Sequence, residues 1–126
     1  LLSEWSNVPI RIFIGNRRLE KAEMVAKWIG EGTTDPLVAQ AFCLSDRGLT
    51  KEMEEIFAQG DVLLDCLPGS LAPKMAGYAK KYGLHYVNLT EYVAETNEIM
   101  ALAKNAETGF VLQSGLAPGY IDILAL

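Results

Sequence analysis

The feature that most constrains the fold is an alternation between two hydrophobic periods along the chain. Segments rich in β-branched and aromatic residues predict strands, and they cover residues 8–15, 38–44, 61–67, 85–89 and 110–114. Between them, apolar residues recur at helical spacing over 19–29, 49–57, 71–82 and 90–106. Parallel strands need a crossover connection, usually a helix. The order therefore predicts an α/β, Rossmann-like fold with a mainly parallel, doubly wound sheet.

Finer signals concern helix ends and strand burial. Gly30 and Gly32 are predicted to stop the first helix, and Gly83 is predicted to stop the third. Ser70 and Thr90 are predicted N-caps of the third and fourth helices, because a side-chain oxygen there can accept an otherwise unpaired backbone N–H. The run Val62-Leu63-Leu64 is apolar without alternation, which is typical of a sheet covered on both faces.

Composition excludes several classes of function. A formal charge of −5 argues against a broad nucleic-acid or anionic-membrane surface, and no apolar run is long enough to span a bilayer. Cys43 and Cys66 lie in apolar runs without a CxxC motif, so we expect two small buried residues and no metal site. Their pattern suits a reducing compartment, and a cytoplasmic protein is the expectation.

The search for a site begins at the carboxyl ends of the predicted strands, where open α/β sheets bind ligands. Asn16, Arg17 and Arg18 follow the first predicted strand, and two guanidiniums there can give several donors to a phosphate. An acidic residue for the ribose of NAD is absent from this position, so NADP is favoured over NAD. The alternative is a solvated pair of charges at a helix start.

Two further loops are predicted to approach a ligand. Leu67 and Pro68 precede a helix N-terminus and small residues, and Asn88 and Thr90 lie at the end of the following strand. His85 stands at the opposite end of that strand, so a structural or solvent role is expected for it. Asp65, a carboxylate among apolar neighbours, has a structural or a site role, and both stay open.

The sharpest signal is the turn after the last predicted strand. Two glycines and one proline fix a tight backbone there, in the sequence Gly115-Leu116-Ala117-Pro118-Gly119. Such a turn between a strand and a helix can aim backbone amides at a ligand. The position of the turn in the series of strands favours a site role over an ordinary connection.

The order of motifs resembles the NADP-binding domain of the saccharopine dehydrogenase family over nearly the whole chain. The resemblance rests on four segments, Ile14-Gly15-Asn16-Arg17 with Leu19 to Ala22, 61–68, 83–90 and 115–119. It implies that Arg17 contacts the adenosine 2′-phosphate, that Leu67 and Pro68 lie beside the cofactor ribose, and that 115–119 lie near the nicotinamide and substrate. The chain departs from the family at Asn88, commonly Asp, and at Asp65, commonly an Asn-like residue.

Residues 1–126 lack segments that the family has before and after the part that this chain resembles. The family opens with a strand and a GxGxxG turn that holds the pyrophosphate, whereas Leu1 to Ser6 looks like the tail of the helix that should follow them. Residues 1–126 are therefore interpreted as a partial NAD(P)-binding Rossmann domain without its central strand and without the substrate domain. Alone, it is expected to be inactive.

Two hypotheses of function follow. The first is an NADP-dependent oxidoreductase that acts on a C–N bond of a small-molecule, amino-acid-type substrate. The alternative is a non-catalytic Rossmann-type module for nucleotide binding or association, which the lack of a convincing general base supports. Neither a catalytic residue nor a metal ligand is assigned, no nucleic-acid or membrane partner is expected, and a homo-oligomer stays open.

Overall fold

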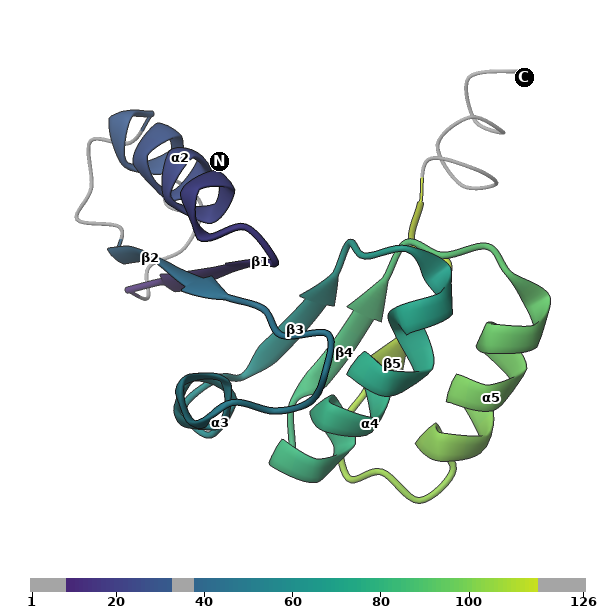
Figure 1. The fold of residues 1–126 in the computed structure, drawn as a ribbon. Helices are drawn as coiled ribbons and strands as arrows, with labels where there is room; N and C mark the ends of the chain where they lie inside the picture. The colour runs from purple at the N-terminus through teal and green to yellow at the C-terminus, as the bar shows by residue number, and fades with distance from the viewer. Residues whose placement is uncertain (1–8, 33–37, 116–126) are drawn as a thin grey trace. The chain divides into compact units, whose positions relative to one another are not determined.

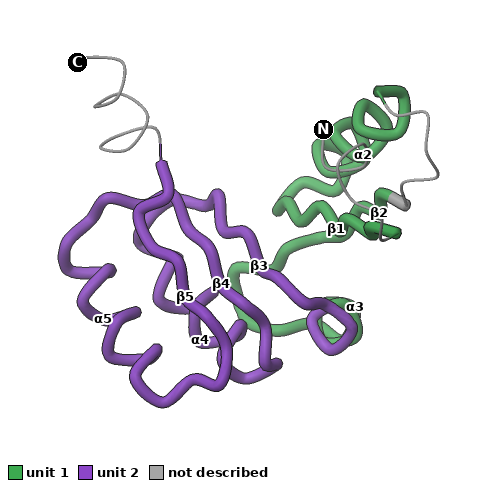
Figure 2. Tube along the Cα trace, turned by 180° about the vertical axis from the view of Figure 1, so that it is seen from behind, with its two compact units in different colours: residues 1–56 green, residues 57–126 purple. Residues whose placement is uncertain are grey.

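The computed structural model describes residues 9–32 and 38–115. The chain divides into two compact units, Leu1–Ile56 and Phe57–Leu126, which Figure 2 distinguishes by colour. The described strands form two sheets, one of two strands and one of three (Figure 1). Both sheets are entirely parallel, so the predicted mixed fold with parallel strands and helical crossovers is confirmed.

The first unit is built on a β-α-β arrangement. Its strands are β1 (Arg11–Asn16) and β2 (Val38–Cys43), and helix α2 (Leu19–Glu31) connects them. The strands pair in parallel from Arg11 opposite Val38 to Asn16 opposite Cys43. Helix α2 packs against both strands and buries Ala22 completely. The predicted strands and helix therefore lie within one to three residues of the observed ones.

The packing of Gly15 against Phe42 links the two strands of this unit. The two residues are register partners, and a Cβ added to Gly15 would lie 2.5 Å from Cζ of the Phe42 ring. Phe42 is 5% exposed. The absence of a side chain at Gly15 is what lets the ring lie over β1. Helix α3 (Lys51–Phe57) ends at the boundary between the units and contributes buried Met53 and Ile56.

The second unit is a three-stranded parallel sheet in the order β3-β4-β5. Its strands are β3 (Val62–Asp65), β4 (His85–Asn88) and β5 (Phe110–Val111), and its helices are α4 (Ala72–Tyr82) and α5 (Val93–Ala103). Helix α4 packs against β3 and β4, and α5 packs against α4, as Figure 1 shows. The last predicted strand is shorter than expected, since only two residues of it pair.

The helix starts of this unit differ from the predictions. A short 3-10 helix, η1 (Gly69–Leu71), precedes α4, and Pro68 rather than Ser70 stands at its start. Helix α5 starts after Tyr92, without a side-chain cap, so the predicted Thr90 cap is also wrong. Thr90 instead belongs to the loop between β4 and α5. The Gly83 stop is confirmed, because this residue ends α4 in the left-handed region at φ 67°.

The core of the second unit lies between its sheet and its helices. Leu63, Tyr86 and Ile99 are buried there together with a row of small and flexible α4 side chains, Ala72, Met75, Ala76 and Ala79. Along β3 the burial alternates, so Leu63 and Asp65 are buried while Val62 and Leu64 are exposed. The apolar run that predicted burial on both faces is buried on one face in the described residues, because α4 covers one side of the strand.

Candidate functional site

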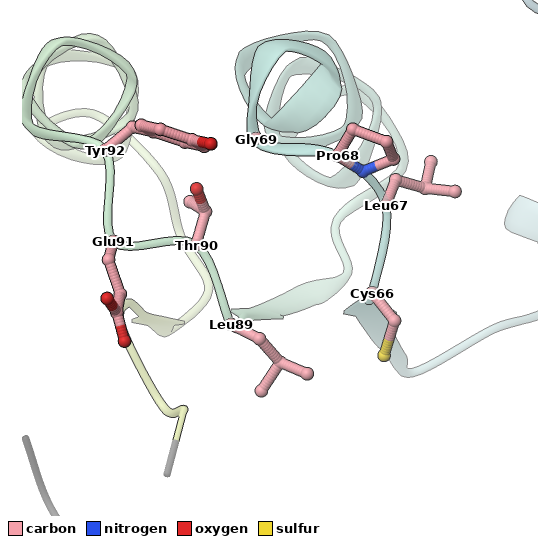
Figure 3. Close-up of a pocket in the computed structure, with 8 residues that line it drawn as sticks. All are labelled: Cys66, Leu67, Pro68, Gly69, Leu89, Thr90, Glu91 and Tyr92. Carbon is pink, nitrogen blue, oxygen red and sulfur yellow. The ribbon is translucent and has the colours of Figure 1, made fainter. Parts of the chain in front are cut away.

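A pocket lies at the carboxyl ends of β3 and β4 in the second unit (Figure 3). Its volume is about 580 Å³, within the range of small-molecule and cofactor sites. One wall is the turn that follows β3 and the other is the loop between β4 and α5. The lining residues are Cys66, Leu67, Pro68, Gly69, Leu89, Thr90, Glu91 and Tyr92. This is the edge of a parallel sheet at which α/β proteins bind their ligands.

The structure brings together three of the residues predicted from the sequence, Leu67, Pro68 and Thr90. Glu91 and Tyr92 also line the pocket, and the sequence analysis did not assign them. Both follow Thr90 directly, so extending the predicted loop by two residues would have found them. Asn88 is buried behind the pocket and does not line it.

The two walls of the pocket meet at Gly69. A Cβ added to Gly69 would clash with the Tyr92 ring and with the Thr90 hydroxyl oxygen, and Figure 3 shows both side chains directed toward this glycine. The Thr90 hydroxyl is buried and has no hydrogen-bond partner among the residues that the structure describes. A buried hydroxyl without a partner is costly, so this oxygen is a candidate contact for a ligand.

Behind the pocket, Asp65 and Tyr86 form a buried pair. Asp65 is 4% exposed and Tyr86 is fully buried. The Tyr86 hydroxyl donates a hydrogen bond of 2.7 Å to Oδ2 of Asp65, and it lies 3.2 Å from the carbonyl oxygen of Ala72. Oδ1 of Asp65 accepts the backbone N–H of Leu67 at 2.9 Å. Burial, together with the Asp65 carboxylate, raises the pKa of Tyr86 well above its ordinary value, so the phenol stays protonated.

As Asp65 holds the turn after β3, Asn88 holds the segment after β5 by hydrogen bonds to its backbone. Its Oδ1 accepts the backbone N–H of Gln113 at 3.0 Å, and its carbonyl oxygen accepts the N–H of Ser114 at 2.9 Å. Gln113 has a φ of 58°, a left-handed conformation that is uncommon for a residue with a side chain. These bonds hold the chain where it leaves the sheet toward Gly115.

The amide nitrogen of Asn88 has no partner that meets hydrogen-bond geometry among the described residues. It is near enough to the Tyr86 hydroxyl to lower the pKa of that phenol slightly, against the larger effects of burial and Asp65. The contact is therefore a weak one. Of the predicted turn, Gly115 is described, while Leu116, Ala117, Pro118 and Gly119 lie outside the described residues.

In the first unit, Asn16, Arg17 and Arg18 follow β1 as predicted. Oδ1 of Asn16 accepts the backbone N–H of Arg18 at 3.0 Å, which closes the turn before α2. Arg17 and Arg18 are exposed, and within the described part of the chain neither guanidinium forms a hydrogen bond or ion pair. Two unpaired cations beside a strand end are available to an anionic ligand.

The two cysteines are not buried, so the sequence prediction was wrong for both. Cys43 and Cys66 are free and exposed. Cys43 ends β2, and Cys66 is the first residue beyond β3, where it lines the pocket. Partial burial, and then the nearby Asp65 carboxylate, raise the pKa of the Cys66 thiol. This thiol is therefore less reactive than its exposure suggests.

His85 has a structural contact at the amino end of β4. Its Nδ1 accepts the backbone N–H of Gly109 at 3.0 Å, which joins the starts of β4 and β5. Among the described residues, no cluster of His, Cys, Asp and Glu could hold a metal ion. Within the same ranges, no helix has the length and apolar character needed to cross a membrane.

Parallel strands joined by helices, with a pocket at the strand ends, define a Rossmann-like nucleotide-binding domain. Residues 1–112 match the model of the saccharopine dehydrogenase NADP binding domain. The chain belongs to this family, and NADP is the cofactor that the family assigns to it.

A solved structure has a similar fold, that of apo histidine-tagged saccharopine dehydrogenase (L-Glu forming) from Saccharomyces cerevisiae. The TM-score is 0.70 at 18% sequence identity, and the match covers 98% of this chain and 25% of that chain. The chain thus spans about a quarter of the length of that protein, and the likeness concerns the fold. No curated protein sequence matches the chain.

Proposed function

We propose that the chain is the cofactor-binding domain of an NADP-dependent oxidoreductase that acts on a C–N bond of an amino-acid-type substrate. The observation that carries the proposal is the pocket at the carboxyl ends of β3 and β4 in a chain that matches an NADP-binding family over 1–112. The solved relative is a saccharopine dehydrogenase by name, which supports the choice of substrate class.

The residues of the pocket fit a sugar or ring portion of the cofactor better than a phosphate. The lining contains one acidic residue, Glu91, and no Lys or Arg, so it offers no cation to a phosphate. The buried Thr90 hydroxyl lacks a protein partner, which suits hydrogen bonding to a ribose. Leu67 and Pro68 add apolar surface, as is usual in cofactor pockets.

The phosphate contact belongs, in this proposal, to the exposed guanidinium of Arg17, with Asn16 and Arg18 beside it. Residues 115–119 would lie near the nicotinamide and the substrate. When bound, NADP supplies the hydride chemistry, and the protein binds and orients the reactants. Such a reaction interconverts a C–N single bond and an imine. The two free cysteines, which suit a reducing compartment, support a cytoplasmic location.

The experiment is a comparison of NADPH and NADH binding to the Arg17→Ala variant of the full-length protein by calorimetry. Losing a charge-assisted contact to the 2′-phosphate should weaken NADPH binding by roughly tenfold to a hundredfold. NADH, which lacks that phosphate, should bind as it does to the wild type.

Arg11→Ala is the matched control, because Arg11 is an exposed arginine at the opposite end of the same strand. It should leave both affinities within about twofold. Equal losses for NADPH and NADH would contradict the role of Arg17. A full-length protein that binds neither nucleotide would favour the non-catalytic association module.

A further inference from the structure

Three buried polar side chains from β3 and β4 lie behind the pocket. Asp65 and Asn88 are register partners, and each is the residue before the first pocket residue of its own wall, Cys66 or Leu89. Tyr86 precedes Asn88 by two residues, so its side chain lies on the same face of the strand. Exposure is 4% for Asp65, 1% for Asn88 and zero for Tyr86.

A carboxylate in such a place is costly to bury unless hydrogen bonds compensate it. Asp65 receives two of them, from the Leu67 N–H at 2.9 Å and from the Tyr86 hydroxyl at 2.7 Å. The first bond fixes the turn that becomes one wall of the pocket. The second fixes the carboxylate itself, because the Tyr86 ring is fully buried and packs 5.5 Å from Phe110. A buried apolar side chain at position 65 would leave the Leu67 amide without this acceptor.

Asn88 completes the arrangement on the neighbouring strand. Its Oδ1 holds the Gln113 N–H at 3.0 Å, at the residue whose backbone adopts the left-handed conformation. Backbone in such a conformation persists only where its surroundings hold it. The three side chains thus connect the turn after β3, the end of β4 and the segment after β5.

We propose that Asp65, Tyr86 and Asn88 are positioning residues that hold the walls of the cofactor pocket in their binding geometry. The inference rests on the proposed function, and it assigns these side chains a role in affinity without contact with the cofactor. Preorganised walls reduce the ordering that a ligand must otherwise impose on its site.

The test measures NADPH affinity for Tyr86→Phe in the full-length protein. This substitution removes one hydroxyl and keeps the ring in the core. We expect the Kd for NADPH to rise about tenfold, because the Asp65 carboxylate loses its anchor. Thr108→Val is the matched control, because it removes a hydroxyl that donates a 2.8 Å bond to the Leu84 carbonyl at the opposite end of β4. Its Kd should stay within about twofold of the wild type.

A pair of substitutions at Asp65 distinguishes the effect of its hydrogen bonds on NADPH affinity from the effect of its negative charge. Asparagine retains an oxygen for the Leu67 N–H, and its amide can donate to the Tyr86 hydroxyl, which is then free to donate to the Ala72 carbonyl 3.2 Å away. Asp65→Asn should therefore keep NADPH affinity within about threefold, whereas Asp65→Leu should lose about tenfold or more. Equal losses in both variants would show that the charge matters and would overturn the positioning role.

Hydrogen exchange at the Leu67 amide provides a readout independent of the cofactor. It should be faster in Tyr86→Phe and Asp65→Leu than in the wild type and in Thr108→Val. Unchanged exchange, or an NADPH affinity of Tyr86→Phe equal to that of the wild type, would overturn the inference. A wild-type protein that binds no NADPH would instead overturn the proposed function, and the exchange rates would still decide whether the Tyr86–Asp65 bond holds the turn.

Discussion

The two units place their candidate binding residues in opposite environments. In the first unit, Arg17 and Arg18 are exposed after β1. Two side chains hold the local turn: Oδ1 of Asn16 accepts the Arg18 N–H, and the Cys43 thiol lies 3.6 Å from the Arg17 carbonyl oxygen. In the second unit, the pocket walls are partly buried and are held from behind by buried Asp65 and Asn88. The comparison shows two ways to prepare a ligand contact. The first unit offers exposed positive charges, and the second offers a shaped surface whose supporting side chains are buried.

Two glycines sharpen this comparison, since each unit has one whose added Cβ would overlap a neighbouring aromatic ring. In the first unit the ring is Phe42, buried in the core, and in the second it is Tyr92, which is 63% exposed at the pocket. The first glycine should therefore matter for stability and the second for binding.

The largest expected effect is that of Gly15→Ala on stability. The new methyl group would lie 2.5 Å from the Phe42 ring, and the buried ring cannot turn into solvent. We expect the free energy of unfolding to fall by about 1–3 kcal/mol, measured by urea unfolding. Gly30→Ala is the control, because no atom lies within 4 Å of its added Cβ and alanine suits a helix better. It should gain about 0.5–1 kcal/mol. Equal stability of the two variants would refute the packing role of Gly15.

The next effect is that of Gly69→Ala on binding. Tyr92 can swing away from the new methyl group, and the Thr90 hydroxyl, which has no protein partner to lose among the described residues, can rotate away from it. Stability should therefore fall by less than about 1 kcal/mol. The pocket loses its shape, and the Kd for NADPH should rise about tenfold, or about 1.4 kcal/mol. Gly77→Ala on α4, where the added Cβ meets no atom within 4 Å, should bind NADPH as the wild type does. A large loss of stability without a change in Kd would remove the contrast with Gly15.

The smallest effect appears at alkaline pH. The folded-state pKa of Tyr86 is raised by burial and by Asp65. The contribution of Tyr86 to the free energy of unfolding is therefore fully present below about pH 10, the ordinary tyrosine pKa. It is lost as the pH rises above that value, by up to about 1.4 kcal/mol per pH unit. Tyr86→Phe lacks this contribution. The difference in unfolding free energy between the wild type and Tyr86→Phe should shrink as the pH rises from about 10 to about 11. A difference that stays constant would mean that the phenol is not protected from ionisation in the fold.

Much of the fold was predictable because it depends on local patterns. The helical spacing over 19–29 and the β-branched run ending at Gly15 gave α2 and β1 within a few residues. Helix starts were less predictable. Ser70 and Thr90 have the chemistry of N-caps, but Pro68 starts a 3-10 turn before α4, and Thr90 lies in the pocket loop. Whether a hydroxyl caps a helix depends on the residue at which the backbone becomes helical after the preceding strand.

For the site, the rule that ligands bind at strand ends pointed to the loops that contain Leu67, Pro68 and Thr90, and these three residues line one pocket. The same rule placed Asn88 in the pocket, whereas the alternation of side chains along β4 turns it inward, beside Asp65. The alternating burial of β3 likewise turns Asp65 inward and leaves Cys66 outside.

The sequence by itself determined the α/β class and the order of the elements, because hydrophobic period and turn residues act over short stretches of chain. The family followed from the resemblance of its motifs. Only the tertiary structure decided the distant partner of Asp65, the Tyr86 hydroxyl 21 residues away, whereas the Leu67 amide lies only two residues along the chain. A carboxylate in an apolar strand must find donors. Which donors it finds depends on strand register, and register exists only once the sheet has formed.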